Sequence, residues 1–308
     1  MSISSVKNSG IGGVKSNAIS DIDKTVDGVP VDFLVVGGGG LPDNRQTANL
    51  YSGGGGAGGL LTSIAGDNSG GTVNAPSPKF IATIGTSYSV EIGASKGETY
   101  FSGVSAGVGG SGGSGSSSAN RASSQRGGDN QAAGPTNVFA NQGHAGGNGN
   151  PGAKNAAGGG GGAGAVGSNA TFDNGADGGV GRISTIISAS DATTYSVGEV
   201  SGSDVYFAGG GGGAGFSTGG DGGLGGGGDG KTGTTAAQNG AANTGGGGGG
   251  AYNAAAGAGG SGVVILKFPD TYTINVGAGL TDATSGGITS GGFTTVILTA
   301  GTDTVSWS

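Results

Sequence analysis

The chain has 308 residues, 82 of them glycine, and only 10% of its residues are charged. Its formal net charge is −7 and its 12 lysines and arginines are scattered, which argues against nucleic-acid binding, because phosphate neutralisation needs a clustered basic face. With no cysteine, the chain has neither a disulfide framework nor a thiolate metal site. No stretch approaches the apolar length of a membrane span, and residues 1–7 lack the apolar core of a signal peptide. We therefore expect synthesis in the cytoplasm and no membrane insertion.

Much of the glycine lies in unbroken runs. These are residues 37–40, 53–56, 158–162, 209–213, 225–228 and 245–250. Fixing the backbone costs roughly 1–2 kcal/mol per residue and glycine has no side chain to bury, so only the backbone N–H and C=O groups can order such runs. Polyproline-II helices point all of these groups outward, and helices of glycine can approach closely enough to bond laterally. We therefore predict a bundle of glycine-rich polyproline-II helices with short β-strands or small β-sheets at its ends and essentially no α-helix.

The composition divides the chain into three regions. Residues 1–30 are polar, with apolar residues only singly placed, and are predicted to form an N-terminal attachment arm. Residues 31–268 contain the glycine runs and form the predicted bundle domain. Residues 269–308 alternate like strands and form a small C-terminal β appendage, which is too small to be called an independent domain.

Strands are predicted between the glycine runs. Residues 31–36 and 263–268 are continuously apolar, which is typical of strands buried on both faces, so we expect these two to pair near one end of the bundle. Hairpins are expected from residues 80–84 with 88–92, 182–188 with 194–197, and 293–299 with 304–307, the last around a turn at 300–303. Further short strands are expected at residues 99–102, 204–208 and 271–276.

Several segments follow one another in a specific order. Strand 31–36 runs into glycine, residues 53–61 read GGGGAGGLL, residues 88–94 read YSVEIGA, and residues 259–268 read GGSGVVILKF. This order resembles the glycine-rich domain of tailed-bacteriophage fibre proteins over residues 31–268. Residues 271–308 are similar to the C-terminal extension of such proteins in marine phages. The resemblance extends to the distal tail-fibre adhesins of T-even-like phages, in which loops between glycine helices touch the bacterial surface.

The resemblance implies a virion protein, most often one that recognises the host. The expected function is that of a tail-fibre-type adhesin whose loops between helices bind a bacterial surface glycan or an outer-membrane protein. Other virion proteins would be contacted through residues 1–30 or the β ends, and the chain would be a trimer if it is fibre-like. The alternative is a purely structural virion component, such as a capsid decoration, head fibre or tail protein, that uses the bundle as a rigid spacer.

Candidate receptor-binding residues lie on two connections between glycine runs. Aromatic rings can stack on the apolar face of a sugar while amides bond its hydroxyls. The candidates are Arg45, Asn49 and Tyr51 on the first connection, and Arg121, Arg126, Phe139, Asn141 and His144 on the second. The other interpretation is that aromatic residues such as Tyr51, Phe139, Phe172, Phe216 and Tyr252 close the bundle ends by burying apolar surface.

No motif predicts an enzyme, a cofactor or a metal site. Residues 225–232, GGGGDGKT, satisfy the Walker A pattern, but glycine-rich sequence stands where a P-loop needs a preceding strand and a following helix. Residues 109–113 satisfy G-x-S-x-G, but Ser111 lies among serines and glycines typical of a loop. His144 is the sole histidine, and a lone histidine in a polar loop is typically a surface residue. We therefore predict no catalytic residues.

Overall fold

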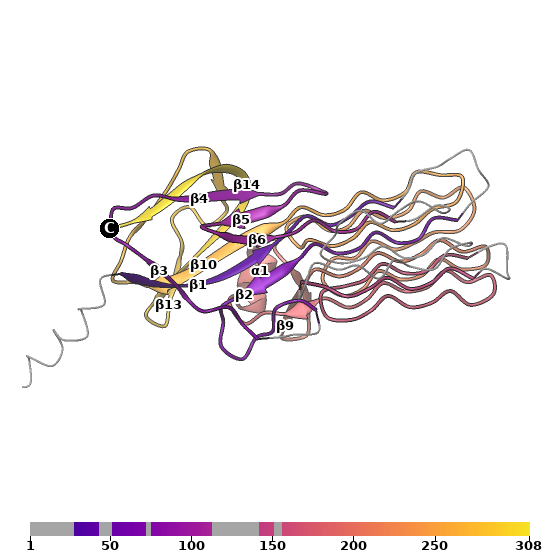
Figure 1. The fold of residues 1–308 in the computed structure, drawn as a ribbon, viewed down its shortest axis with the longest axis horizontal. Helices are drawn as coiled ribbons and strands as arrows, with labels where there is room; N and C mark the ends of the chain where they lie inside the picture. Colours follow the sequence, from indigo (N-terminus) through magenta and orange to yellow (C-terminus); the bar gives the residue numbers. More distant parts are fainter. Residues whose placement is uncertain (1–27, 43–50, 72–74, 113–141, 151–155) are drawn as a thin grey trace, which may run out of the picture.

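The computed structural model describes residues 28–42, 51–71, 75–112, 142–150 and 156–308. In this part of the chain, strands gather at one end and long parallel runs of extended backbone form the other (Figure 1). The strands are β1 (Val29–Val36), β2 (Leu60–Thr62), β3 (Phe80–Ala82), β4 (Tyr88–Ile92), β5 (Thr99–Phe101), β6 (Val104–Ala106), β7 (Arg182–Ile183), β8 (Glu199–Ser201), β9 (Asp204–Phe207), β10 (Val263–Pro269), β11 (Ile274–Val276), β12 (Leu280–Asp282), β13 (Ile288–Ser290) and β14 (Phe293–Trp307). One helix, α1 (Ala189–Tyr195), accompanies them.

The large sheet is built around three neighbouring strands. Its order is β2-β1-β10-β14-β4-β5-β6; β3 also pairs with β1, and β11, β12 and β13 pair with β14. The sheet curls until β6 contacts β1 and β2, so that it is nearly closed. A second sheet has the order β7-β9-β8.

Both faces of the central strands are buried. Phe33 and Val35 belong to one core cluster, which also contains Trp307. Leu34 and Val36 belong to a second core cluster, which also contains residues of the small sheet. All four side chains are at most 1% exposed. The predicted pairing of residues 31–36 with 263–268 is confirmed, because β1 and β10 are antiparallel with Val35 opposite Val264.

Two of the predicted hairpins are wrong because chain neighbours pair with remote strands. β3 pairs with the start of β1, and β4 pairs with β5 and β14, so β3 and β4 form no hairpin. β14 is one strand of 15 residues that pairs first with β10 and then with β4, so the turn predicted at 300–303 does not form. Gly301 lies at φ 99°, and backbone in this left-handed region lets the strand bend between its two partners. Residues 269–308 therefore share the large sheet with residues 29–106.

The third predicted hairpin is replaced by helix α1. Ser188 caps its N-terminus, because the Ser188 hydroxyl accepts from the Asp191 N–H at 3.1 Å and donates to the Asp191 carboxylate at 2.7 Å. The helix ends at Tyr195, and its C-cap residue Ser196 is left-handed at φ 53°. The polar cap therefore outweighs the strand propensity of the Thr-Thr-Tyr segment.

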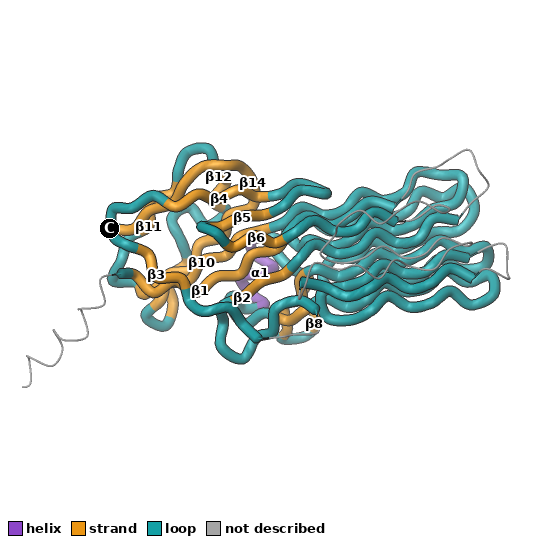
Figure 2. The backbone as a smooth tube through the Cα atoms, in the orientation of Figure 1, coloured by secondary structure: helices purple, strands orange, loops and turns teal. Residues whose placement is uncertain are grey.

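The glycine runs leave the strands as extended segments that lie side by side (Figure 2). One row of backbone hydrogen bonds crosses six of these segments at 2.8–3.0 Å. From donor to acceptor, the row runs Gly179 to Gly160, Gly160 to Gly211, Gly211 to Gly55, Gly55 to Gly248, and Gly248 to Gly40. Each of the four inner residues uses both its N–H and its C=O, which satisfies the backbone without a ladder between paired strands.

These contacts are so close that a side chain would not fit. A Cβ added to Gly211 would lie 2.0 Å from the carbonyl oxygen of Gly248, and one added to Gly247 would lie 2.0 Å from that of Gly55. Real Cβ atoms essentially never approach backbone atoms this closely. The unbroken glycine runs are therefore a steric requirement of the interior.

The predicted fold class is wrong. Strands dominate the regular secondary structure of the described residues, a nearly closed sheet organises them, and the extended glycine segments do not form a bundle of polyproline-II helices. The apolar core is larger than the average composition of the chain suggests. Val, Leu, Ile and Phe are concentrated in β1, β10 and β14, where both faces of the sheet are buried.

Gly211→Ala should lower the free energy of unfolding by about 3 kcal/mol, because the new methyl group overlaps a carbonyl that cannot move alone. Gly233→Ala is the matched control. At Gly233 nothing lies within 4 Å of the added Cβ, and the φ of +58° costs about 1 kcal/mol. Urea unfolding of both variants measures the difference. Equal losses would show that Gly211 is not tightly packed.

Candidate functional site

The candidate site lies where the glycine segments turn back, at the end remote from the strands (Figure 2). Residues 53–59 lead from Ser52 to β2, and residues 209–213 lead from β9 to Ala214. The Ala214 N–H bonds the Ser52 carbonyl at 3.0 Å, which ties two of these ends together. We call residues 51–52, 171–175, 214–218 and 251–253 the distal turns.

Tyr51 is buried within the distal turns. Its ring stacks on that of Tyr252, with centroids 4.2 Å apart and planes at 9°, and it packs with Ala157 and Ala214. Only 3% of Tyr51 is exposed. Burial raises the pKa of the Tyr51 hydroxyl, and the neighbouring Tyr252 and Asp173 raise it further. Tyr51 therefore closes the end of the segments, as the second interpretation of the aromatic residues proposed, and offers little surface to a ligand.

Phe172 and Phe216 lie on the same group of turns but are exposed, at 81% and 60%. Their turns are joined, because the Ser217 N–H bonds the Asp173 carbonyl at 2.9 Å and the Thr218 hydroxyl bonds the Asn174 side chain at 3.1 Å. Phe172 also has a left-handed φ of 48°, which is strained for a bulky residue. For these two rings, the interpretation as buried end closures is wrong.

The residues that flank Phe172 and Phe216 carry a signal for the exposure of both rings. Phe172 stands in Thr-Phe-Asp-Asn-Gly and Phe216 in Gly-Phe-Ser-Thr-Gly, so each ring is flanked by residues that form turns. An aromatic residue inside such a turn has few neighbours to cover it. Exposure follows from the brevity of the turn and not from the residue type.

His144 lies at the other end of the glycine segments. Its N–H bonds the Gly162 carbonyl at 2.9 Å, and Ala163 belongs to the core cluster that contains Phe207 of β9. Ala157, at the opposite end of the same run, packs with Tyr51. The structure therefore does not bring Tyr51 and His144 together. The remaining candidates, Arg45, Asn49, Arg121, Arg126, Phe139 and Asn141, lie outside the described residues.

The surroundings of His144 disfavour the protonated imidazole. Burial lowers its pKa most, the guanidinium of Arg182 lowers it further, and a hydrogen bond with the Gly71 backbone partly opposes them. Its Nε2 is buried and has no hydrogen-bond partner in the described part of the chain. Protonation would therefore place an unpaired charge beside a cation.

The Walker-like residues are engaged within the chain. The N–H groups of Gly225 and Gly226 both donate to the Glu199 carboxylate at 2.7 Å, and Lys231 pairs with Asp229 at 3.2 Å. A turn follows Thr232, where a P-loop would have a helix. Within the described ranges, no group of three or more metal-ligating side chains occurs, and no helix is both long and apolar enough to cross a membrane.

The stability of the protein should fall as the pH decreases below 6.5, because the unfolded chain protonates His144 at its ordinary pKa while the folded chain resists protonation. His144→Gln should remove this dependence between about pH 7.5 and 5.5, since the chain has one histidine. Urea unfolding across this range measures the effect. Parallel pH curves for the parent and the variant would contradict the assignment.

Comparisons with known proteins identify one relationship. No curated protein and no solved structure matches the chain. A family model described as a glycine-rich domain matches residues 20–269. This range includes the glycine segments, the distal turns and strands β1 to β10. Because the match covers more than half of the chain, the protein belongs to this glycine-rich domain family.

Proposed function

We propose that this protein is a bacteriophage virion component, a tail-fibre-type adhesin whose distal turns recognise a glycan on the bacterial surface. The observation that carries the proposal is the exposure of Phe172 and Phe216 on turns that are bonded to each other. The assignment to a phage particle rests on the resemblance of the segment order to phage fibre proteins. An outer-membrane protein is the other receptor class compatible with such a surface.

The distal turns offer the groups that bind sugars. An aromatic face stacks on the apolar face of a sugar ring, while amides and hydroxyls bond its hydroxyl groups. Asn174 and Thr218, next to the two rings, supply an amide and a hydroxyl that already share a bond at 3.1 Å. Two exposed Phe rings on neighbouring turns therefore offer stacking faces, with polar groups close by in the sequence.

The rigidity of the support favours affinity. Asn174 bridges to both Thr171 and Thr218, and the Gly175 N–H bonds the Thr218 carbonyl at 2.8 Å. A ligand that binds such turns has little loop motion to restrict, and binding to a preorganised surface loses less entropy. This is the advantage of placing recognition residues on turns at the end of a stiff scaffold.

A structural role in the virion is the second candidate. Ile81 of β3 and Ile84, which follows it, are 48% and 55% exposed. They lie near the start of β1, because Pro30 is opposite Ile81 in the pairing of β1 and β3. Exposed apolar side chains at this end favour attachment to another protein. Both candidate functions require such an attachment.

The double variant Phe172→Ala/Phe216→Ala should bind bacterial cells about tenfold more weakly than the parent, because it loses both stacking faces. This binding is measured as the cell-bound fluorescence of the labelled full chain. The bacterial strains used are those that bind the parent protein. Val166→Ala is the matched control, since Val166 is 61% exposed but lies outside the distal turns. The thermal midpoints of all three proteins should agree, because none of these side chains is buried.

Normal attachment of the double variant would overturn the assignment to the distal turns. The structural candidate is then favoured if Ile81→Ser/Ile84→Ser prevents incorporation of the chain into phage particles. Loss of attachment in the double variant, with normal incorporation, supports the adhesin.

A further inference from the structure

The chain contains three Asn–Gly steps, at residues 148–149, 174–175 and 239–240. Asparagine is chemically labile at such a step, because glycine has no side chain to keep its backbone nitrogen away from the asparagine side-chain carbonyl. All three asparagines are exposed to water. Exposure therefore does not distinguish the three steps, and any difference between them has to come from hydrogen bonding.

The step at 174–175 is held by Thr218. The Gly175 N–H donates to the Thr218 carbonyl at 2.8 Å, and the Asn174 side-chain oxygen accepts from the Thr218 hydroxyl at 3.1 Å. The two groups that would have to meet are thus both bonded elsewhere. Both hydrogen bonds have to break before the glycine nitrogen can attack the asparagine side chain.

The step at 239–240 is held in the same way by Ala258. The Gly240 N–H donates to the Ala258 carbonyl at 2.7 Å, and the Asn239 side-chain oxygen accepts from the Ala258 N–H at 2.8 Å. This step therefore also loses two hydrogen bonds if it reacts.

The step at 148–149 differs in its glycine. Within the described ranges, the Gly149 N–H donates no hydrogen bond. The backbone of Asn148 is anchored through other atoms, because its N–H donates to the Asn169 side-chain oxygen at 2.7 Å and its carbonyl accepts from the Ala170 N–H at 2.9 Å. The attacking nitrogen of this step therefore has no such bond to give up.

We propose that Asn148 is a site of spontaneous deamidation in the folded protein. The Gly149 nitrogen loses its proton to water or hydroxide and bonds to Cγ of Asn148. The C–N bond of the side-chain amide breaks, and ammonia leaves. Water then opens the resulting succinimide ring at either carbonyl, so that residue 148 becomes aspartate or isoaspartate. Water and the chain itself are the only reactants.

The conversion of Asn148 should loosen the turn that carries Phe172. Ala170, which bonds the Asn148 carbonyl, directly precedes the distal turn at residues 171–175. Isoaspartate adds one carbon to the main chain, and little space is available for it, since a Cβ added to Gly158 would lie 2.9 Å from the Asn148 carbonyl carbon. The displaced carbonyl would then no longer hold the Ala170 N–H.

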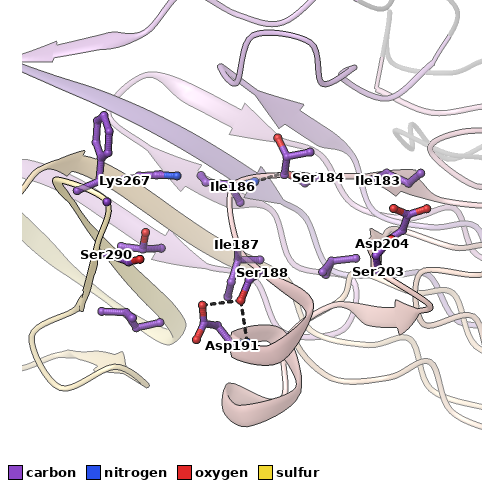
Figure 3. A pocket seen from close by; sticks show the side chains of 16 residues that line it. Ile183, Ser184, Ile186, Ile187, Ser188, Asp191, Ser203, Asp204, Lys267 and Ser290 are labelled. Carbon is purple, nitrogen blue, oxygen red and sulfur yellow. Dashed lines mark hydrogen bonds between the residues drawn. The ribbon is translucent and has the colours of Figure 1, made fainter.

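The strand end of the molecule offers an internal reference. A cleft of about 550 Å³ lies between the two sheets, and its lining includes Ser184, Lys267 and Ser290 (Figure 3). None of the three Asn–Gly steps belongs to this lining. We therefore expect the cleft and the strands that form it to be unchanged by the conversion of Asn148.

The test keeps the full chain at mildly alkaline pH for several days, once folded and once in urea. Trypsin places the three steps on separate peptides, residues 127–154, 155–182 and 232–267, and tandem mass spectrometry follows each asparagine. In the folded protein, Asn148 should convert about tenfold faster than Asn174 and Asn239, because each of these has two hydrogen bonds to lose. In urea, all three should convert at similar rates.

Asn148→Gln is the matched control, because glutamine keeps the amide but would have to close a larger ring. Amide hydrogen exchange of residues 169–176 should rise in the converted parent and stay constant in Asn148→Gln kept under the same conditions. Exchange of β10 should not change in either protein.

Two results would overturn the proposal. Conversion of Asn148 that is no faster than that of Asn174 and Asn239 in the folded protein would refute the assignment of the site. Unchanged exchange of residues 169–176 in the converted parent would refute the effect on the turn. Attachment to cells enters neither measurement, so either failure leaves the adhesin proposal standing.

Discussion

The fold depends on the approach of backbone to backbone between glycine segments. Carbonyl oxygens lie about 2 Å from where a Cβ would stand at Gly211 and Gly247, so no other residue fits without a backbone shift. This contact replaces a hydrophobic core in that half of the molecule, because the N–H and C=O groups are satisfied across segments. The stiffness of the scaffold, and the fixed position of the turns at its end, both follow from it.

The strands determine where the glycine segments begin. Val36 is opposite Val263 in the last pair of β1 with β10, and the next residues continue the contact, since the Gly39 N–H bonds the Gly260 carbonyl at 2.9 Å. Apolar burial on both faces fixes this register, because a slip by one residue would exchange the two cores. The hydrophobic part of the chain thereby aligns a part that has almost no side chains of its own.

The sequence predicts those features that depend on local composition. Strands 31–36 and 263–268 follow from continuous apolar character, whereas the partners of β3 and β4 are remote in the chain, and no local pattern encodes them. At the site, the sequence predicts where the turns occur but not which aromatic rings are buried there. Tyr51 is buried because Tyr252 arrives from a distant part of the chain, whereas no ring among the described residues covers Phe172 in this way.

The contrast between these rings bears on function. A chain with a small apolar content gains stability from each ring that it buries, as it does with Tyr51 and Tyr252. Phe172 contributes no such burial and is held at a left-handed φ, a conformation that costs about 1–3 kcal/mol for a bulky residue. Folding alone would favour a small polar residue or glycine at this turn. The exposure of this ring on a turn held by backbone hydrogen bonds is therefore the ground on which we propose that Phe172 takes part in binding.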